Sequence, residues 1–460
     1  MDVSIGRRAC SYPSPHRGLG IQGNDCLMTT TEPAPINIPQ RMTNAGQTDL
    51  RGGAFLKLLR FGLTVGGPIV VAGANFLVSL LLIPAVSPAT FGVYSFGMVL
   101  LQVAMGVSDG LLGAPLAVHA ARDASRSHKT RLHFHKVGVL LVVAASLVIA
   151  MSLAVLHTLG AAMLFGLYSG AMLMRWYGRA NAFVDDQPLR VGVSDIAYAV
   201  TLLGLVGMLF VAGSISFTAV IGCLVAAAVV GLFALGTVAL RAQILDARAG
   251  STSDFIPVWK EKAGWSLTGI LVNAATIESH VFVATILGGP ATFAPIALAA
   301  LFFRPTLVAV YALAQRERPL LANLIEAGEK AAAVRMSRNN QFLSLALWAG
   351  NSIVAVILSR TILHSYLPEG YDLETVELCI LAFAAVMVSR TIRMPWVVFV
   401  QASNGFRSLA GVTALTAPVS VGLAALGLWF SGPVGCVVGM LAADLLLTSL
   451  VARLFFISGR

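Results

Sequence analysis

Charged residues are scarce in this sequence of 460 residues, and apolar residues are abundant. Only 11% of the residues are Asp, Glu, Lys or Arg, whereas 57% are hydrophobic. A soluble domain needs a charged surface and does not contain so many uninterrupted apolar runs. The composition therefore excludes a soluble globular protein and indicates an integral membrane protein with many spans.

Sequence features of cofactor and metal chemistry are also sparse. The chain has no P-loop, so we expect no ATP hydrolysis, no cofactor and no enzymatic activity. Four histidines cluster without a Cys or carboxylate at ligand spacing, apart from Asp123, and we expect no metal site there: His119, His128, His133 and His135. The five cysteines form neither a disulfide framework nor a zinc motif: Cys10, Cys26, Cys223, Cys379 and Cys436.

The apolar runs predict an all-α integral membrane fold with about twelve transmembrane helices, since each span takes about 20 apolar residues. We expect these helices at roughly 61–85, 90–114, 136–157, 160–177, 192–213, 216–240, 263–286, 292–314, 341–360, 373–400, 409–430 and 433–454.

Basic residues fall on alternate connections between these helices. The connections near Ser87, Leu159, Gly213, Gly289 and Gly432 contain no Lys or Arg, whereas those at 122–136, 179–190, 241–262 and 316–338 contain two to five each. By the positive-inside rule the basic connections are cytoplasmic. We therefore expect a multi-pass protein of the cell inner membrane with both termini in the cytoplasm. The formal net charge of +10 then points to membrane lipids, not nucleic acid, as the partner of the basic loops.

An internal repeat divides the chain into halves. The turn Ser87-Pro88-Ala89-Thr90-Phe91 is echoed by Gly289-Pro290-Ala291-Thr292-Phe293, and apolar runs flank both turns. Each half has an even number of helices, so the repeat is parallel and a substrate cavity is expected between two six-helix lobes. We predict a disordered tail, an N-lobe, a flexible cytoplasmic linker and a C-lobe at 1–54, 55–240, 241–262 and 263–460.

Three stretches resemble one group of membrane proteins. The segment 75–122, with PATFGVYSFGMVLLQ and SDGLLGAPLAVHAAR, resembles the start of the polysaccharide-biosynthesis flippases of the MOP superfamily. The stretches 366–386 and 431–447 are similar to that family's tenth helix, with its preceding loop, and to its last hairpin. The resemblance implies a MATE-like fold and transport of a polyprenyl-diphosphate-linked oligosaccharide for exopolysaccharide, capsule or O-antigen assembly. It further implies a polysaccharide polymerase and export proteins as possible partners.

Arginines inside the predicted helices are the first candidates for a substrate site. Ionisable groups at membrane depth are costly and therefore suggest a function. Arg304 lies in helix eight, and the repeat aligns it with Gln102 of helix two. Arg390 and Arg393 share one face of helix ten. Their guanidinium groups suit the oxygens of a diphosphate. For Arg390 and Arg393, snorkelling to the interface or an internal ion pair is an equal alternative.

Acidic residues in the predicted helices are few. Glu278, with His280 nearby in helix seven, is either an ion-coupling site or the charge partner of Arg304, and we favour the partner. Asp109 and Asp195 lie near predicted cytoplasmic helix ends, where solvent or a helix-end role accounts for them. Arg175 similarly closes helix four at the inner surface.

Three functions follow from these features. The first is the flippase, working by alternating access. The second is a cation-coupled MATE-type exporter of small molecules, which would use Asp109 or Glu278 as its coupling carboxylate. The third is a membrane polymerase or glycosyltransferase, which the short outer loop at 361–372 disfavours.

Overall fold

A computed structural model describes residues 52–113, 115–116, 127–361, 363–403 and 405–458. The predicted tail, the two cysteines within it and much of the first basic loop lie outside these residues. The described part is almost entirely helical and has no strand. The predicted all-α fold is therefore confirmed. Residues 54–460 form one compact unit.

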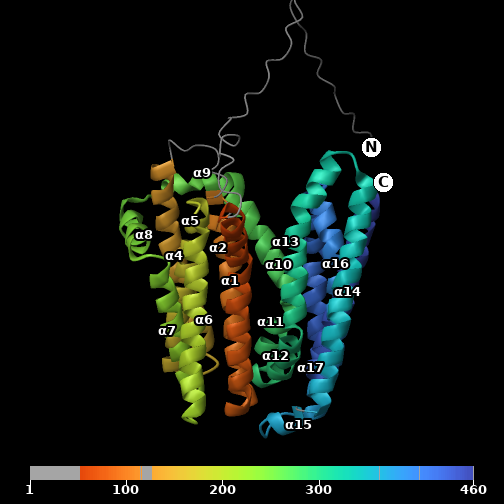
Figure 1. The fold of residues 1–460 in the computed structure, drawn as a ribbon. Helices are drawn as coiled ribbons and strands as arrows, with labels where there is room; N and C mark the ends of the chain where they lie inside the picture. Colours follow the sequence, from red (N-terminus) through yellow and green to blue (C-terminus); the bar gives the residue numbers. More distant parts are fainter. Residues whose placement is uncertain (1–51, 114, 117–126, 362, 404, 459–460) are drawn as a thin grey trace, which may run out of the picture. The chain divides into compact units, whose positions relative to one another are not determined.

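The predicted N-lobe consists of six long helices (Figure 1). They are α1 (Gly52–Leu82), α2 (Pro88–Ser108), α4 (Ser127–Ala154), α5 (Leu159–Val184), α6 (Pro188–Val211) and α7 (Phe217–Ala234). A π-helical turn, Asp109–Gly113, extends α2.

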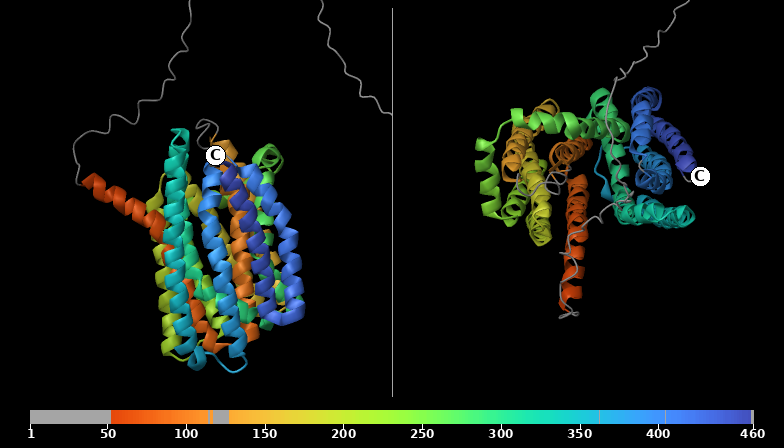
Figure 2. Two further views of the ribbon diagram at one scale, coloured as in Figure 1. Left: turned by 90° about the vertical axis from the view of Figure 1, so that its right-hand side faces the viewer. Right: turned by 90° about the horizontal axis from the view of Figure 1, so that it is seen from above.

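The predicted C-lobe begins with two broken helices. α10 (Gly264–Ile277) and α11 (Ser279–Gly288) meet at 63°, and α12 (Pro290–Phe302) and α13 (Arg304–Glu326) meet at 54°. The lobe continues with α14 (Lys330–Thr361), the short α15 (Leu363–Tyr366), α16 (Leu373–Ala402) and α17 (Phe406–Ser458). Seen from above, these helices lie to one side of most of the N-lobe helices (Figure 2, right).

The number of spans agrees with the sequence. Among the described residues, eight helices are long and apolar enough to cross a membrane, and the two bent pairs raise the number to ten. α17 has 53 residues and contains two helices joined at a kink at Ser431 and Gly432. α5 has 26 residues but carries Arg175 and Arg179, which make it less apolar. Counting α17 twice and adding α5 gives the expected twelve.

The two repeated turns start helices that pack against each other. Ser87 caps α2, where its hydroxyl accepts the N–H of Thr90 at 3.3 Å. Gly289 precedes α12 with φ +85°, a conformation that favours glycine. A Cβ on Gly92 of α2 would overlap the carbonyl oxygen of Pro290. The backbones of the two lobes therefore touch at their predicted outer ends.

A second contact joins the lobes at the same end. The hydroxyl of Tyr366 in α15 donates to the carbonyl oxygen of Leu80 in α1. Next to it, Asp372 caps α16 by accepting the N–H of Glu374 at 3.3 Å. The hydroxyl of Thr375 also donates to this carboxylate, and this hydrogen bond lowers the pKa of Asp372.

The segment expected to be a flexible linker is largely helical. It contains most of α8 (Thr237–Ala249), the short α9 (Ile256–Val258) and a π-helical turn, Trp259–Ala263. Ser251 donates its N–H to Nδ1 of His133 at 2.9 Å. Phe255 packs edge-on against Phe134, with 5.3 Å between ring centroids. The segment still connects α7 to α10, but its apolar and polar contacts with α4 order it.

Glycines bring the two halves of α17 together. A Cβ on Gly435 would overlap the carbonyl oxygen of Gly427, and one on Gly439 would overlap that of Leu423. Gly435 and Gly439, at GxxxG spacing, thus allow the two halves to pack closely.

Gly439→Val is expected to destabilise the protein by about 1–3 kcal/mol, the usual cost of overpacking. The lowered melting temperature of the purified protein would show it. Gly411→Val is the matched control, because a Cβ on Gly411 meets nothing within 4 Å. Equal melting temperatures of the two variants would contradict the close approach.

Candidate functional site

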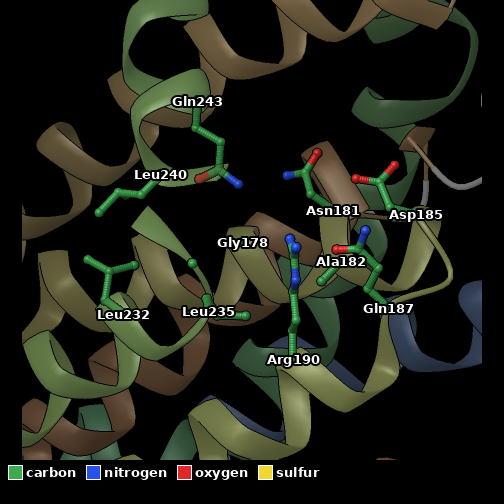
Figure 3. Close-up of a pocket in the computed structure, with 11 residues that line it drawn as sticks. Gly178, Asn181, Ala182, Asp185, Gln187, Arg190, Leu232, Leu235, Leu240 and Gln243 are labelled. Carbon is green, nitrogen blue, oxygen red and sulfur yellow. The ribbon is translucent and has the colours of Figure 1, made fainter. Parts of the chain in front are cut away.

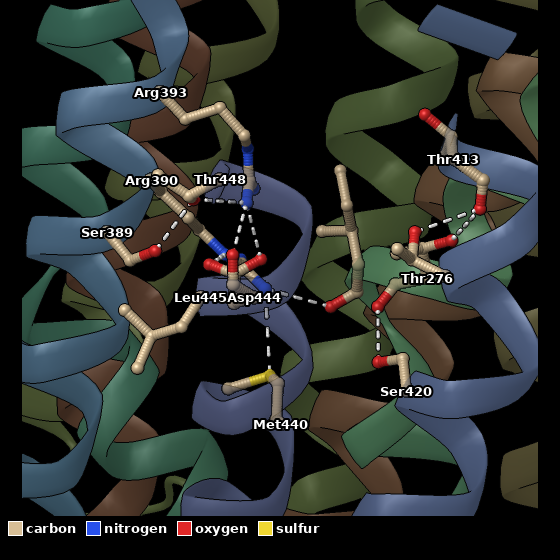
Figure 4. A network of polar contacts seen from close by, with 12 residues as sticks. Thr276, Ser389, Arg390, Arg393, Thr413, Ser420, Met440, Asp444, Leu445 and Thr448 are labelled. Atoms are coloured by element: carbon tan, nitrogen blue, oxygen red, sulfur yellow. Dashed lines mark hydrogen bonds and ion pairs between the residues drawn. The ribbon is translucent and has the colours of Figure 1, made fainter. Parts of the chain in front are cut away.

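Two arginines of α16 share one carboxylate in the C-lobe (Figure 4). Arg393 Nη1 donates to Asp444 Oδ1 at 2.9 Å and to the Thr448 hydroxyl at 3.1 Å. Arg390 Nε lies 3.4 Å from Asp444 Oδ2. The spacing of three residues puts both arginines on one helical face, and the second half of α17 supplies Asp444. The internal ion pair, one of the two predictions for these arginines, is present.

Arg390 is less well satisfied than Arg393. Its Nη2 donates to the carbonyl oxygen of Ile277 at 3.1 Å and to the Met440 sulfur at 3.6 Å. A thioether is a weak acceptor. The Nε atom is buried and makes no hydrogen bond. Arg390 therefore retains donor capacity for an acceptor stronger than a sulfur atom.

A cavity of about 710 Å³ lies within the C-lobe, between α10, α13, α16 and α17. Ligand pockets commonly have about 300–1,000 Å³. Arg390, Arg393 and Arg407 line it, and none of its described lining residues is Asp or Glu. Tyr311 and Asn273 add polar groups to walls that are otherwise mostly apolar. Such a cavity favours an anionic ligand with an apolar portion.

Each helix break carries a charged residue that is close in the chain to a residue lining this cavity. Glu278 lies between α10 and α11, and Arg304 is the first residue of α13. Both side chains are half-buried. Arg304 lies one turn before Leu307, which lines the cavity. Interrupted helices in transporters often carry the substrate and ion sites.

Glu278 lies within electrostatic range of two arginines. It interacts with Arg390 and with Arg304. Arg304 in turn lies within electrostatic range of Tyr94 and Tyr168 in the N-lobe. Among the described residues, no direct ion pair joins Glu278 to either arginine. The predicted partnership is therefore a charge interaction at longer range, without a direct ion pair.

The other predicted site residues are not among those that line this cavity. Gln102 is exposed on α2, and His280 is buried against Phe383 with 5.9 Å between ring centroids. Asp109 accepts a hydrogen bond from Trp176 Nε1 at 2.8 Å. Ser108 and Asp109 lie in a Gly-x-Ser-x-Gly sequence, a motif that carries the nucleophile of some hydrolases. Here the motif lies at the end of a helix and not in the strand–turn–helix setting of a hydrolase.

Asp195 is not a solvated helix-end residue, and that prediction is wrong. Its side chain is 0% exposed, and both Arg175 and Arg179 donate to its Oδ1. Arg175 also donates from Nε to the Ser194 hydroxyl at 2.9 Å. Its guanidinium carbon lies 4.9 Å from the ring centroid of Tyr198. The carboxylate is buried because α6 turns it toward α5, where the two arginines are one helical turn apart.

The two lobes therefore share an arrangement that the sequence analysis missed. In each lobe, two arginines of the fourth long helix pair with one aspartate of a later helix: Arg175, Arg179 and Asp195 in the N-lobe, and Arg390, Arg393 and Asp444 in the C-lobe. Each cluster carries one excess positive charge. The arginine spacings of four and three residues were visible in the sequence, but the carboxylate partners were not.

Comparison with protein families and with curated proteins gives no match. Solved structures of MATE transporters are similar to the chain. The MATE transporter VcmN of Vibrio cholerae in its bent form is 16% identical, with a TM-score of 0.56, over 88% of this chain and 96% of that one.

Two conformations of a multidrug resistance MATE family transporter of the MOP superfamily are similar as well. The inward-facing one is 12% identical, with a TM-score of 0.59, over 84% of this chain and 93% of that chain. The outward-facing one is 12% identical, with a TM-score of 0.56, over 87% and 93%. The predicted MATE-like fold is thus confirmed. All three similar structures are of transporters.

Proposed function

We propose that the protein is a transporter of the MOP superfamily that moves a polyprenyl-diphosphate-linked oligosaccharide across the cell inner membrane. The observation that carries this proposal is the C-lobe cavity, whose described lining includes three arginines and no carboxylate. Its apolar walls and cationic groups suit an anionic amphiphile. The MATE-like fold supports transport by alternating access between the two lobes.

In the proposed mechanism the diphosphate binds between the two helix breaks. Arg390 exchanges its sulfur contact for a phosphate oxygen, and Arg304 approaches from α13. The bidentate geometry of guanidinium groups favours such oxygens. The polyprenyl chain stays in the bilayer while the lobes change sides. An inside-negative potential favours outward movement of negative charge by about 2.3 kcal/mol per charge per 100 mV.

The orientation and the partners form part of the same proposal. The basic connections face the cytoplasm, and both termini lie inside. The substrate would be taken from the inner leaflet and delivered outside to a polysaccharide polymerase and export proteins.

A cation-coupled exporter of small molecules is the second candidate. The similar solved structures include a multidrug resistance transporter, and Glu278 places a carboxylate at a helix break. Such a transporter would move organic cations, and its activity would depend on Glu278.

Flipping in proteoliposomes of the purified protein separates the two candidates. Arg390→Gln removes charge-assisted hydrogen bonds worth about 1.5–3 kcal/mol each, so the rate with a polyprenyl-diphosphate oligosaccharide is expected to fall about tenfold or more. Arg335→Gln, at an exposed position of α14, is the matched control and should leave the rate unchanged.

Two results would speak against the flippase. One is an Arg390→Gln variant that flips the oligosaccharide lipid as fast as the unchanged protein. The other is the absence of flipping together with ethidium transport that Glu278→Gln abolishes, which would favour the exporter.

A further inference from the structure

A second, smaller cavity lies at the predicted cytoplasmic end of the N-lobe, away from the proposed transport site (Figure 3). It has a volume of about 40 Å³ and is lined by residues from the ends of α5, α6, α7 and α8. A water molecule needs a cavity of about 10–15 Å³. The space suits a few waters, or a phosphate group together with one hydroxyl.

The cavity has an unpaired cation in its wall. The guanidinium of Arg190 points from α6 into the space between Gly178 and Asn181 (Figure 3). Within the part of the chain that the structure describes, Arg190 forms neither an ion pair nor a side-chain hydrogen bond. The nearby carboxylate of Asp185 is already paired, with 2.7 Å between its Oδ1 and Arg131 Nη2.

Two helix N-termini add to this positive potential. Gln187 precedes α6 and Gly236 precedes α8, and both line the cavity. No side chain caps either terminus. The free N–H groups and the dipole at a helix N-terminus favour phosphate oxygens. With Arg190, they make a site for one phosphate group.

A buried amide supplies the second observation. Gln243 of α8 is only 5% exposed and points into the cavity from the side opposite Arg190 (Figure 3). Its Oε1 atom is buried and accepts no hydrogen bond. An unsatisfied buried acceptor is costly. A ligand at this site should therefore carry a hydroxyl donor close to its phosphate.

The surroundings indicate that this ligand is a lipid. Leu189 and Val193 of α6 are 44% and 48% exposed, and Phe233 of α7 is 54% exposed. These residues lie within about a turn of the cavity lining on the same helices, where acyl chains would pack. The position of Arg190 in a basic connection puts the cavity at the level of the inner-leaflet headgroups.

We propose that this cavity binds the headgroup of phosphatidylglycerol. Arg190 and the N-termini of α6 and α8 hold the phosphate, and a glycerol hydroxyl donates to Gln243 Oε1. The site is separate from the proposed transport cavity and does not depend on the transported substrate.

Native mass spectrometry of the purified full chain, with defined lipids added, tests the assignment. The unchanged protein should retain phosphatidylglycerol more strongly than phosphatidic acid, which lacks the glycerol hydroxyls, and phosphatidylcholine. Arg190→Ala should lower retention of both anionic lipids at least fivefold. Gln243→Leu should lower the retention of phosphatidylglycerol to that of phosphatidic acid. The retention of phosphatidic acid itself should not change.

The control is Arg248→Ala, which removes an exposed arginine of α8 that does not line the cavity. It should bind all three lipids as the unchanged protein does. Equal retention of the three lipids by the unchanged protein, or variants that retain phosphatidylglycerol normally, would overturn the proposal. Displacement of the lipid by equimolar glycerol phosphate would show a soluble ligand and overturn the lipid assignment.

Discussion

Asp195→Asn is expected to destabilise the folded protein by about 3–5 kcal/mol, the cost of breaking a buried ion pair. The carboxylate is 0% exposed and pairs with two arginines, of which Arg175 is 1% exposed. Without it, two guanidinium groups remain buried in the N-lobe with no counter-charge. A lower melting temperature and a smaller yield of purified protein would show the effect.

Asp186→Asn is the matched control for this prediction. Asp186 is exposed and has φ +55°, which asparagine tolerates. It forms no ion pair among the described residues. The melting temperature of the Asp186→Asn variant should therefore equal that of the unchanged protein. Combining Asp195→Asn with Arg179→Gln removes one of the two uncompensated charges and should restore part of the loss. Equal stability of the Asp195 and Asp186 variants would contradict the buried cluster.

Gly92→Val is expected to stop transport by preventing closure of the predicted outer end. A Cβ at this position would overlap the carbonyl oxygen of Pro290, a backbone atom that cannot rotate away. Overpacking costs about 1–3 kcal/mol, which lowers the population of the closed conformation roughly 5-fold to 150-fold. The separation of the lobes there would increase.

Spin labels at Ala89 and Ala291, both exposed near the starts of α2 and α12, would measure this separation. The distance distribution should shift to longer values in Gly92→Val. Gly73→Val is the control, because a Cβ on Gly73 meets nothing within 4 Å. An unchanged distribution together with full transport would contradict the contact between the lobes.

The sequence was sufficient to predict the spans and the repeat. Long apolar runs mark a helix that faces lipid whatever its neighbours are. The turn at Ser87 was readable because a capping hydroxyl followed by proline is a local signal. The equivalent turn at Gly289 was readable from its similarity to the first.

The helix breaks and the linker structure were not predicted. The run around Glu278 and the run around Phe303 are apolar on both sides, so periodicity gives no sign of bends of 63° and 54°. The segment near Asp246 is polar enough to suggest flexibility. Its fold depends on partners more than a hundred residues away, such as His133.

Only the arginines of the C-lobe charge cluster were recognised as candidates from the sequence. Arg390 and Arg393 stand out because arginine inside a span is rare. Asp444 and Asp195 lie on other helices, and which side chains meet across a bundle depends on helix rotation and tilt. The single-sequence pattern therefore indicated cationic positions but not the carboxylates that hold them.

The leaflet distribution of lipid-linked oligosaccharide in living cells tests the flippase most directly. It should be compared between cells with the intact gene, cells without it and cells carrying Arg304→Ala. The account predicts that the oligosaccharide lipid accumulates on the inner leaflet in both altered strains. A normal distribution in the deletion strain, in cells with no second flippase, would contradict the proposed function.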